Sequence, residues 1–245
     1  KIALFCDVDK DSVIPLQTVD TIYEVPLILS QAGMGARIIN SLNLPKKELH
    51  LQNWRNMVER IKTPRDSIEI AIVGKYADLP DAYISVKESL HHAALDHDKA
   101  VHLNWIPSEM IEREGPDKFL EYVCGIVVPG GFGSRGIEGM ITAAQYAREN
   151  NIPYLGLCLG MQLMVIETAR NVAGLTNANS TEFDADSPYP VIDLMPEQRL
   201  VSDVGGTMRL GIYPCQLEPD TIAGRSYGKV IVDERHRHRF ELNND

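Results

Sequence analysis

A cysteine stands between two glycines in the segment LGLCLGMQ, residues 155–162. The preceding IPYLGL has the apolar run of a buried strand, and the following MQLMVIETARNVAG has helical spacing. A sharp turn from strand to helix crowds the positions two before and two after its central residue. Gly156 and Gly160 occupy both positions, so the spacing predicts a nucleophile elbow with the Cys158 thiol at its centre.

A helix that begins after Cys158 also offers free N–H groups and partial positive charge, which favour a thiolate over a thiol. The alternative is a buried structural cysteine, which is the commoner fate of a free thiol. With 18 glycines and four cysteines in 245 residues, random placement gives roughly 0.02 such motifs. The motif therefore favours a catalytic cysteine.

An acyl-transfer nucleophile needs hydrogen-bond donors where the oxyanion forms. The N–H of Leu159 is one expected donor, because this residue follows the nucleophile directly. The expected source of a second donor is the glycine-rich loop in VVPGGFGSRG, residues 127–136, for which a plain turn is the alternative. Ligands of open α/β sheets bind beyond the carboxyl ends of the strands, where both segments are predicted to lie.

The elements that would position these residues alternate from residue 68 onward. Apolar strands are predicted in IEIAIVGKY, KAVHLNWI, GIVVPGG and IPYLGL, with helices between them. Such alternation predicts an α/β fold with a mostly parallel sheet covered by helices on both faces. After Gly174 the pattern breaks into short, turn-rich segments, which we expect to form β-hairpins or a lid.

The first part of the chain has a different pattern. KIALFCDV is expected to be a strand, TVDTIYEVPLILSQAG and KKELHLQNWRNMVERI to be helices, and KTPRDS to be a linker. So few elements bury little apolar surface, so we expect residues 1–66 to belong to a second domain and residues 67–245 to form the α/β domain. The chain begins without Met and inside an element, which suggests a fragment of a longer protein.

Composition limits the partners that we expect. Lys and Arg total 24 against 34 Asp and Glu, a net charge of -10, which argues against nucleic acid or an anionic membrane as the main partner. No apolar run approaches the roughly 20 residues needed to span a bilayer. The four cysteines are far apart, without a C-x-x-C pair or metal-ligand spacing. We therefore expect a cytoplasmic protein with no metal site.

Several of these segments together resemble the CTP synthase family. GIVVPGGFGSRGIEGMI, IPYLGLCLGMQ and NANSTEF are similar to its class I glutamine amidotransferase domain, and GGTMRLG and ERHRHRFELNN to that family specifically. KIALFCDV and DTIYEVPLIL resemble the end of its synthetase (amidoligase) domain. The resemblance implies a flavodoxin-like three-layer sandwich with added β segments for residues 67–245, and the end of the synthetase domain plus a linker for residues 1–66.

The activity implied by the resemblance is ATP-dependent amination of UTP to CTP, with glutamine as the nitrogen source. Cys158 would attack the amide of L-glutamine, ammonia would leave, and water would hydrolyse the glutamyl thioester. Without the resemblance, Glu182 would be interpreted as a solvated loop charge. The same likeness implies that Gly131 and Leu159 donate to the oxyanion. The residues implied to hold glutamine are Gly131, Leu159, Gly160, Met161, Gln162, Glu182 and Arg239.

Class I members complete the site with a His-Pro-Glu motif, in which His is the general base and Glu orients it. The 245 residues contain no such motif, so we expect the amidotransferase domain to be incomplete at its C-terminus. His236 and His238 are candidate stand-ins, but the resemblance assigns their stretch to substrate binding and a lid. We therefore expect thiol labelling of this chain at most, and negligible glutamine turnover.

Nucleotide ligands are implied by the resemblance alone. The family uses ATP and Mg²⁺, is activated by GTP, and is expected to form a homotetramer through the synthetase domain. Lys1 and Val19 resemble positions that touch the pyrimidine nucleotide and the adenine of ATP. The synthetase P-loop and magnesium carboxylates are absent from the sequence, so we expect no cofactor bound by this chain alone. Positions associated with GTP are matched by Arg135, Glu138, Thr207 and Arg209, for which structural salt bridges are the alternative.

Two other functions are compatible with the sequence. A stand-alone DJ-1/PfpI-like cysteine hydrolase also places a cysteine on an elbow in an α/β sheet. A catalytically inactive regulatory or scaffold module would keep the fold for assembly. Covalent labelling of Cys158 by an electrophilic glutamine analogue separates the amidotransferase from both.

Overall fold

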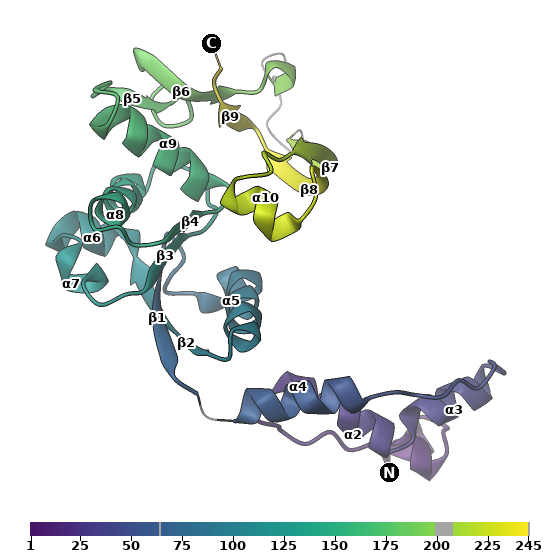
Figure 1. Ribbon diagram of the computed structural model, residues 1–245. Helices are drawn as coiled ribbons and strands as arrows, with labels where there is room; N and C mark the ends of the chain where they lie inside the picture. The colour runs from purple at the N-terminus through teal and green to yellow at the C-terminus, as the bar shows by residue number, and fades with distance from the viewer. Residues whose placement is uncertain (64, 199–207, 245) are drawn as a thin grey trace. The chain divides into compact units, whose positions relative to one another are not determined.

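Figure 1 shows the computed structural model of the chain. The structure describes residues 1–63, 65–198 and 208–244. Within these ranges, no helix is long and apolar enough to cross a membrane. The chain divides into two compact units, each made of a long segment and a shorter one, and Cys158 lies in the second unit.

The first unit, formed by Lys1–Asp66 and His92–Ala100, is built mostly of helices. Both helices predicted in this region are present, and a further one follows Gly33, which has a positive φ of 77°. The indole N–H of Trp54 donates to the Tyr23 carbonyl at 2.8 Å and ties two of these elements together. The elements are α1 (Ile2–Phe5), η1 (Lys10–Ser12), η2 (Ile22–Glu24), α2 (Val25–Gln31), α3 (Met34–Ser41) and α4 (Gln52–Lys62).

The prediction of a strand in KIALFCDV is wrong, because Ile2–Phe5 of this segment form the short helix α1. Leu4 and Phe5 on this helix are 84% and 85% exposed. By periodicity, a short apolar run fits a buried strand and a helical segment equally well. Only a neighbouring strand could decide between them, and within the described residues none pairs with this segment.

The second unit, Ser67–His91 with Val101–Asp245, is organised around a four-stranded sheet with the order β2-β1-β3-β4. Strand β3 runs parallel to β1 and to β4, with Val127 opposite both Ile72 and Leu155. All four strands were predicted as apolar runs. Their bounds are β1 (Ser67–Gly74), β2 (Ala100–Pro107), β3 (Gly125–Val128) and β4 (Tyr154–Gly156).

Helices connect these strands and pack on the sheet. They are η3 (Pro80–Tyr83), α5 (Ile84–Asp96), α6 (Ser108–Glu114), α7 (Asp117–Leu120), α8 (Ile137–Glu149) and α9 (Leu159–Asn171). Figure 1 shows α5 on one side of the sheet and α6, α7 and α8 on the other. Helix α6 was not predicted, and α7 is shorter than expected.

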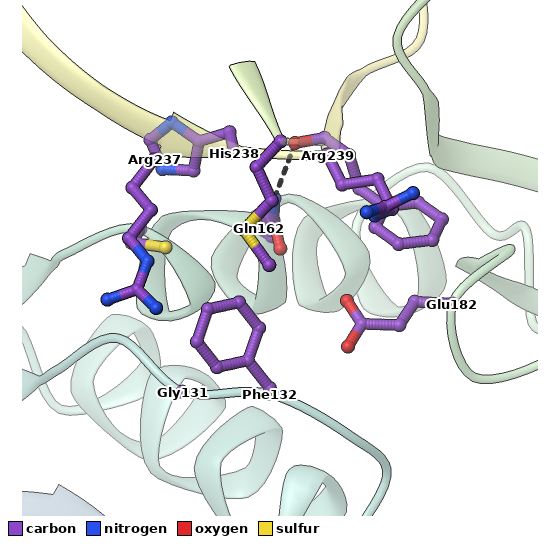
Figure 2. A pocket seen from close by; sticks show the side chains of 10 residues that line it. Gly131, Phe132, Gln162, Glu182, Arg237, His238 and Arg239 are labelled. Carbon is purple, nitrogen blue, oxygen red and sulfur yellow. Dashed lines mark hydrogen bonds between the residues drawn. The ribbon is translucent and has the colours of Figure 1, made fainter. Parts of the chain in front are cut away.

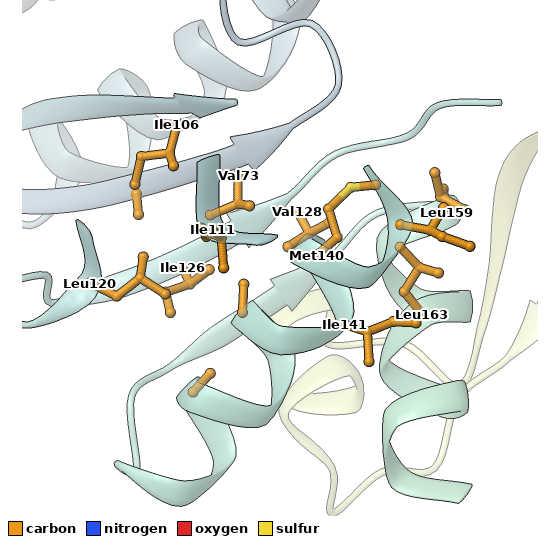
Figure 3. Packing of buried hydrophobic residues seen from close by; sticks show 14 of the residues in the cluster. Val73, Ile106, Ile111, Leu120, Ile126, Val128, Met140, Ile141, Leu159 and Leu163 are labelled. Carbon is orange, nitrogen blue, oxygen red and sulfur yellow. The ribbon is translucent and has the colours of Figure 1, made fainter. Parts of the chain in front are cut away.

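Alternation of side chains along the strands divides the core between the two faces. Val128 belongs to the larger cluster, with Met140 of α8 and Leu163 of α9 (Figure 3). Ile72 and Val127 belong to a smaller cluster on the opposite face, where α5 contributes apolar side chains. Burial on both faces explains why these strands are continuous apolar runs, and it confirms the predicted three-layer α/β fold.

The segments after Gly174 form added β structure, as predicted. Three strands make one small sheet in the order β5-β6-β9, and β7 and β8 form an antiparallel hairpin. A short helix, which was not predicted, lies between the two strands of the hairpin. The bounds are β5 (Ala178–Ser180), β6 (Tyr189–Leu194), η4 (Pro196–Gln198), β7 (Arg209–Gln216), α10 (Ile222–Tyr227), β8 (Ile231–His238) and β9 (Phe240–Leu242).

Candidate active site

Cys158 lies at the turn between β4 and α9, where it is the N-cap residue of the helix. Its φ of 53° and ψ of -107° are a strained conformation for a residue with a Cβ. A Cβ on Gly156 would lie 2.5 Å from the Gly160 carbonyl carbon, and one on Gly160 would lie 2.0 Å from the Val128 oxygen. Neither position has room for a side chain, so the elbow predicted from the glycine spacing is present.

The Cys158 thiol is partly buried, and burial raises its pKa above the ordinary value. The backbone N–H of Leu159 lowers the thiol pKa, whereas the Glu182 carboxylate raises it. The Leu159 N–H at the helix N-terminus therefore favours the thiolate, as predicted, but desolvation outweighs it and the pKa of the thiol is raised. The raised pKa favours the neutral thiol of Cys158 near pH 7.

The glycine-rich loop after β3 passes directly over this thiol. A Cβ placed on Gly130 would lie 3.3 Å from Cys158 Cβ and 3.6 Å from its Sγ. A Cβ placed on Gly131 would lie 3.4 Å from a methyl carbon of Leu159, the first residue of α9. The two segments expected to form an oxyanion site thus meet at the carboxyl ends of the parallel strands β3 and β4.

A cavity of about 300 Å³ opens at Cys158, with side chains from the loop, α9 and the β8–β9 segment around it (Figure 2). This volume is at the lower end of the range for small-molecule sites. Glu182 and Arg239 bring an acidic and a basic group to the cavity. Its lining consists of Gly131, Phe132, Cys158, Gln162, Glu182, Met208, Arg237, His238, Arg239 and Phe240.

Three residues implied to hold glutamine do not line the cavity. The Leu159 side chain is buried and does not line the cavity. Gly160 packs against the Val128 backbone, and Met161 is 37% exposed. The predicted site residues that do line the cavity are Gly131, Cys158, Gln162, Glu182 and Arg239.

Two of these lining residues are held by backbone groups. The Gln162 side chain is buried, and its Nε2 donates to the Phe240 carbonyl at 3.0 Å, which ties α9 to β9. Glu182 Oε1 accepts from the Gly133 N–H at 2.9 Å. Both contacts fix cavity side chains to segments that are distant in the sequence.

Four lining residues were missed, namely Phe132, Met208, Arg237 and Phe240, and His238 was named only as a candidate stand-in for the base. Phe132 stands inside the glycine-rich loop, and the Arg237 guanidinium lies 5.9 Å from the centre of its ring. Burial lowers the pKa of the His238 imidazole, and the neighbouring His236 and Arg209 lower it further. The available signal was the basic run RHRHR, which the resemblance assigned to substrate binding and a lid without naming Arg237 as a site residue.

Two of the residues assigned to GTP have partners within the chain. Arg135 forms an ion pair with Glu109, and its Nη2 donates to the Lys75 carbonyl at 2.7 Å. Glu138 on α8 forms an ion pair with Arg170 on α9 at 2.9 Å. These contacts connect neighbouring elements, and neither residue lines the cavity.

The other two GTP candidates are Thr207 and Arg209. Thr207 lies outside the described residues. The Arg209 guanidinium lies 3.8 Å from the centre of the Tyr213 ring, and its nitrogens lie 3.7 Å from a Glu197 oxygen and 3.9 Å from a Glu241 oxygen. The assignment of all four residues to GTP stays a prediction.

The residues assigned to the synthetase nucleotides lie in the first unit. Lys1 is the exposed N-cap residue of α1, and Val19 is half-buried in the segment between η1 and η2. Their contact with a nucleotide stays a prediction. Among the residues that the structure describes, no group of three or more His, Cys, Asp or Glu is placed to hold a metal ion.

Comparison with known proteins supports the geometry. Residues 78–245 match the family described as glutamine amidotransferase class-I. The chain belongs to the class I glutamine amidotransferase family. Residues 1–44 of this amidotransferase match the family described as the CTP synthase N-terminus. The two matches confirm the resemblance to CTP synthase and the fold class inferred from the sequence.

Relatives of this amidotransferase are similar to it along the whole chain. A CTP synthase of Dehalococcoides mccartyi is 58% identical over 245 residues, which are 100% of this chain and 45% of the relative. The CTP synthase of Carboxydothermus hydrogenoformans is 57% identical, over 100% of this chain and 46% of the relative. The chain thus spans less than half of the length of these relatives.

A solved structure is also similar to this amidotransferase. The glutaminase domain of Trypanosoma brucei CTPS, with bound acivicin, superposes with a TM-score of 0.66 at 42% sequence identity. The likeness covers 72% of this chain and 68% of that chain.

Proposed function

We propose that this chain carries the glutamine-hydrolysing site of a CTP synthase. One observation carries the proposal: a strained cysteine elbow lies beneath a glycine-rich loop, with the Gly130 Cβ position 3.6 Å from Cys158 Sγ, at a cavity lined by Glu182 and Arg239. The family match and the relatives named CTP synthase support it.

In the proposed reaction, Cys158 Sγ attacks the side-chain carbonyl carbon of L-glutamine. A carbon–sulfur bond forms, and the carbonyl oxygen becomes an oxyanion that accepts from the backbone N–H groups of Leu159 and Gly131. Collapse of this intermediate breaks the carbon–nitrogen bond and releases ammonia. Water then hydrolyses the glutamyl thioester, which gives glutamate and restores the thiol.

The proposed base is the His of a His-Pro-Glu motif outside these 245 residues, as the family resemblance implies. Because burial raises the pKa of the Cys158 thiol, the neutral thiol predominates near pH 7 and the attack requires proton transfer. The imidazole would take that proton and later deliver it to the departing nitrogen.

Substrate recognition is proposed to rest on charge. The Glu182 carboxylate would pair with the glutamine ammonium group, and the Arg239 guanidinium with its carboxylate. Gln162 would contribute its amide at the cavity wall. Gly160 and Met161 would act through the backbone of the first turn of α9, because their side chains do not line the cavity.

For the whole protein we propose ATP-dependent amination of UTP to CTP, in the cytoplasm. Residues 1–66 would be the end of the synthetase domain and its linker, with Lys1 and Val19 near the nucleotides, and residues 67–245 the amidotransferase domain. ATP with Mg²⁺, activation by GTP and a homotetramer are parts of the same proposal. Support comes from the match of residues 1–44 to the CTP synthase N-terminus.

The proposed site is tested by reaction with acivicin, used as an electrophilic glutamine analogue, followed by mass spectrometry of the peptides. We expect one adduct on Cys158 and slower labelling when L-glutamine is present. Cys158→Ala should abolish the adduct, whereas Cys124→Ala, which removes an exposed thiol, should leave it unchanged. Labelling at the same rate with and without L-glutamine, or labelling that persists in Cys158→Ala, would contradict the proposal.

A further inference from the structure

Lys75 follows β1 directly and is only 5% exposed. A lysine is almost never buried to this degree unless its ammonium group has partners. Sequence reasoning assigned no role to this residue, because IEIAIVGKY was interpreted only as a strand. The partners of Lys75 show what its burial achieves.

The Lys75 ammonium group binds the glycine-rich loop. Its Nζ donates to the Phe132 carbonyl at 3.0 Å and also to the Gly133 carbonyl. The Lys75 stem packs beneath the same loop, since a Cβ on Gly131 would lie 3.3 Å from Lys75 Cδ. The ring of Phe183 lies 6.0 Å from Nζ.

The peptide group between Phe132 and Gly133 is held at both of its polar ends. Lys75 Nζ binds its carbonyl oxygen, and Glu182 Oε1 accepts from its N–H at 2.9 Å. The peptide is planar and trans, so its C=O and N–H point in opposite directions. Two opposite charges on opposite sides therefore fix the plane of this peptide.

The backbone of Lys75 holds the far end of the loop as well. Its carbonyl accepts from Arg135 Nη2 at 2.7 Å, and Arg135 in turn pairs with Glu109 at the start of α6. The loop from Gly131 to Arg135 is thus attached to one residue at the end of β1. Glycines on both sides of Phe132 would otherwise leave the loop free to rotate its peptides.

We propose that Lys75 is a positioning residue for the oxyanion loop, which keeps the Gly131 N–H directed at the position where the glutamine oxyanion forms. This inference rests on the proposed glutaminase function. It also assigns Glu182 a second task, because the carboxylate that would pair with the substrate ammonium group holds the other end of the same peptide. Substrate binding and loop geometry are thereby coupled.

The test compares Lys75→Met with Lys118→Met in the full-length protein. Methionine keeps the unbranched apolar stem but removes the ammonium donor. Lys118 is the matched control, because it is a surface lysine of the same unit, paired with Glu114. The measurements are kcat and KM for glutamine hydrolysis, with the active fraction determined by acivicin titration, and the inhibition constant of glutamate γ-semialdehyde.

Loss of one oxyanion donor lowers kcat by about 10²–10³-fold, so a misdirected donor should lower it by about 10–100-fold. We expect this loss for Lys75→Met, with KM changed less than about threefold, whereas Lys118→Met should resemble the wild type. The aldehyde adds the Cys158 thiol across its C=O bond and places an oxygen in the oxyanion site. Its inhibition constant should rise by the same factor as kcat/KM falls.

Three results would overturn the inference. One is an unchanged kcat in Lys75→Met, and another is a kcat loss explained by the active fraction. The third is a rise in KM without any change in aldehyde binding. If the wild-type protein hydrolyses no glutamine, the proposed function itself fails, and the inference fails with it. Circular dichroism of Lys75→Met shows whether the variant folds, and Lys75→Gln, which retains a donor, gives a second variant.

Discussion

The reactive state of Cys158 is set by opposing local effects. Burial and the Glu182 carboxylate raise the pKa of the thiol, and the Leu159 N–H lowers it. The first helical N–H is therefore not sufficient to make a thiolate. This arrangement suits an enzyme whose nucleophile is activated only when a base and a substrate are in place, and it would protect the thiol from unwanted oxidation.

The raised pKa predicts how alkylation of Cys158 depends on pH. Iodoacetamide reacts with the thiolate, so the rate should keep rising with pH beyond the point at which an unperturbed thiol, with a pKa near 8.5, levels off. The measurement is the modification rate of the Cys158 peptide by mass spectrometry between about pH 6 and about pH 11. A free cysteine peptide in the same tube is the control. If the rate for Cys158 levelled off at a lower pH than the rate for the control peptide, the raised pKa would be contradicted.

At the scale of elements, the elbow depends on the close contact between α9 and β3. The Gly160 position has no room for a Cβ, because the Val128 oxygen would lie 2.0 Å from it. The same approach brings the N-terminus of α9, with Cys158, beneath the loop that follows β3. The absence of a side chain at Gly160 therefore allows both the close packing of α9 on the sheet and the position of Cys158 beneath the loop.

Gly160→Ala should force the first turn of α9 away from β3. Overpacking of this kind costs about 1–3 kcal/mol of unfolding free energy, and it should slow acivicin labelling of Cys158 at the same time. The control is Gly35→Ala in α3, where no heavy atom lies within 4 Å of the Cβ position. That change should leave stability equal or raise it by up to about 1 kcal/mol. Urea unfolding measures the stability of both variants. If Gly160→Ala had the stability and the acivicin labelling rate of the wild type, the account would be contradicted.

The central sheet and the elbow were predictable because each has a local signal. Buried parallel strands are continuous apolar runs, and the elbow needs glycines at fixed spacing around Cys158. Helices α6 and α10 were missed because they are only seven and six residues long, too short for a clear helical period. Helix α1 was mistaken for a strand because a short apolar run does not show in the sequence whether a neighbouring strand pairs with it.

The remaining parts of the site depend on contacts between distant segments. Lys75 binds carbonyls that are 57 and 58 residues away, and Gln162 binds a carbonyl 78 residues away. No local pattern distinguishes Lys75 from the last residue of an ordinary strand. The resemblance assigned the RHRHR stretch to substrate binding and a lid, and the fold shows that His238 of this stretch lines the cavity with Cys158.

At the scale of the whole molecule, the chain combines parts of two families. Residues 1–44 match the CTP synthase N-terminus and residues 78–245 match the class I amidotransferase. In the proposed enzyme, ammonia made at Cys158 is used by a different domain. The chemistry therefore separates into a glutamine step that needs Cys158 and an amination step that needs only ammonia.

The most direct test follows the amide nitrogen of glutamine in the full-length protein. With L-[amide-¹⁵N]glutamine, UTP, ATP, Mg²⁺ and GTP, mass spectrometry should find ¹⁵N in the amino group of the CTP formed. Cys158→Ala should transfer none of this label, and it should still make CTP from an added ammonium salt. Label in CTP from Cys158→Ala, or wild-type protein that releases no ammonia from glutamine, would contradict the account.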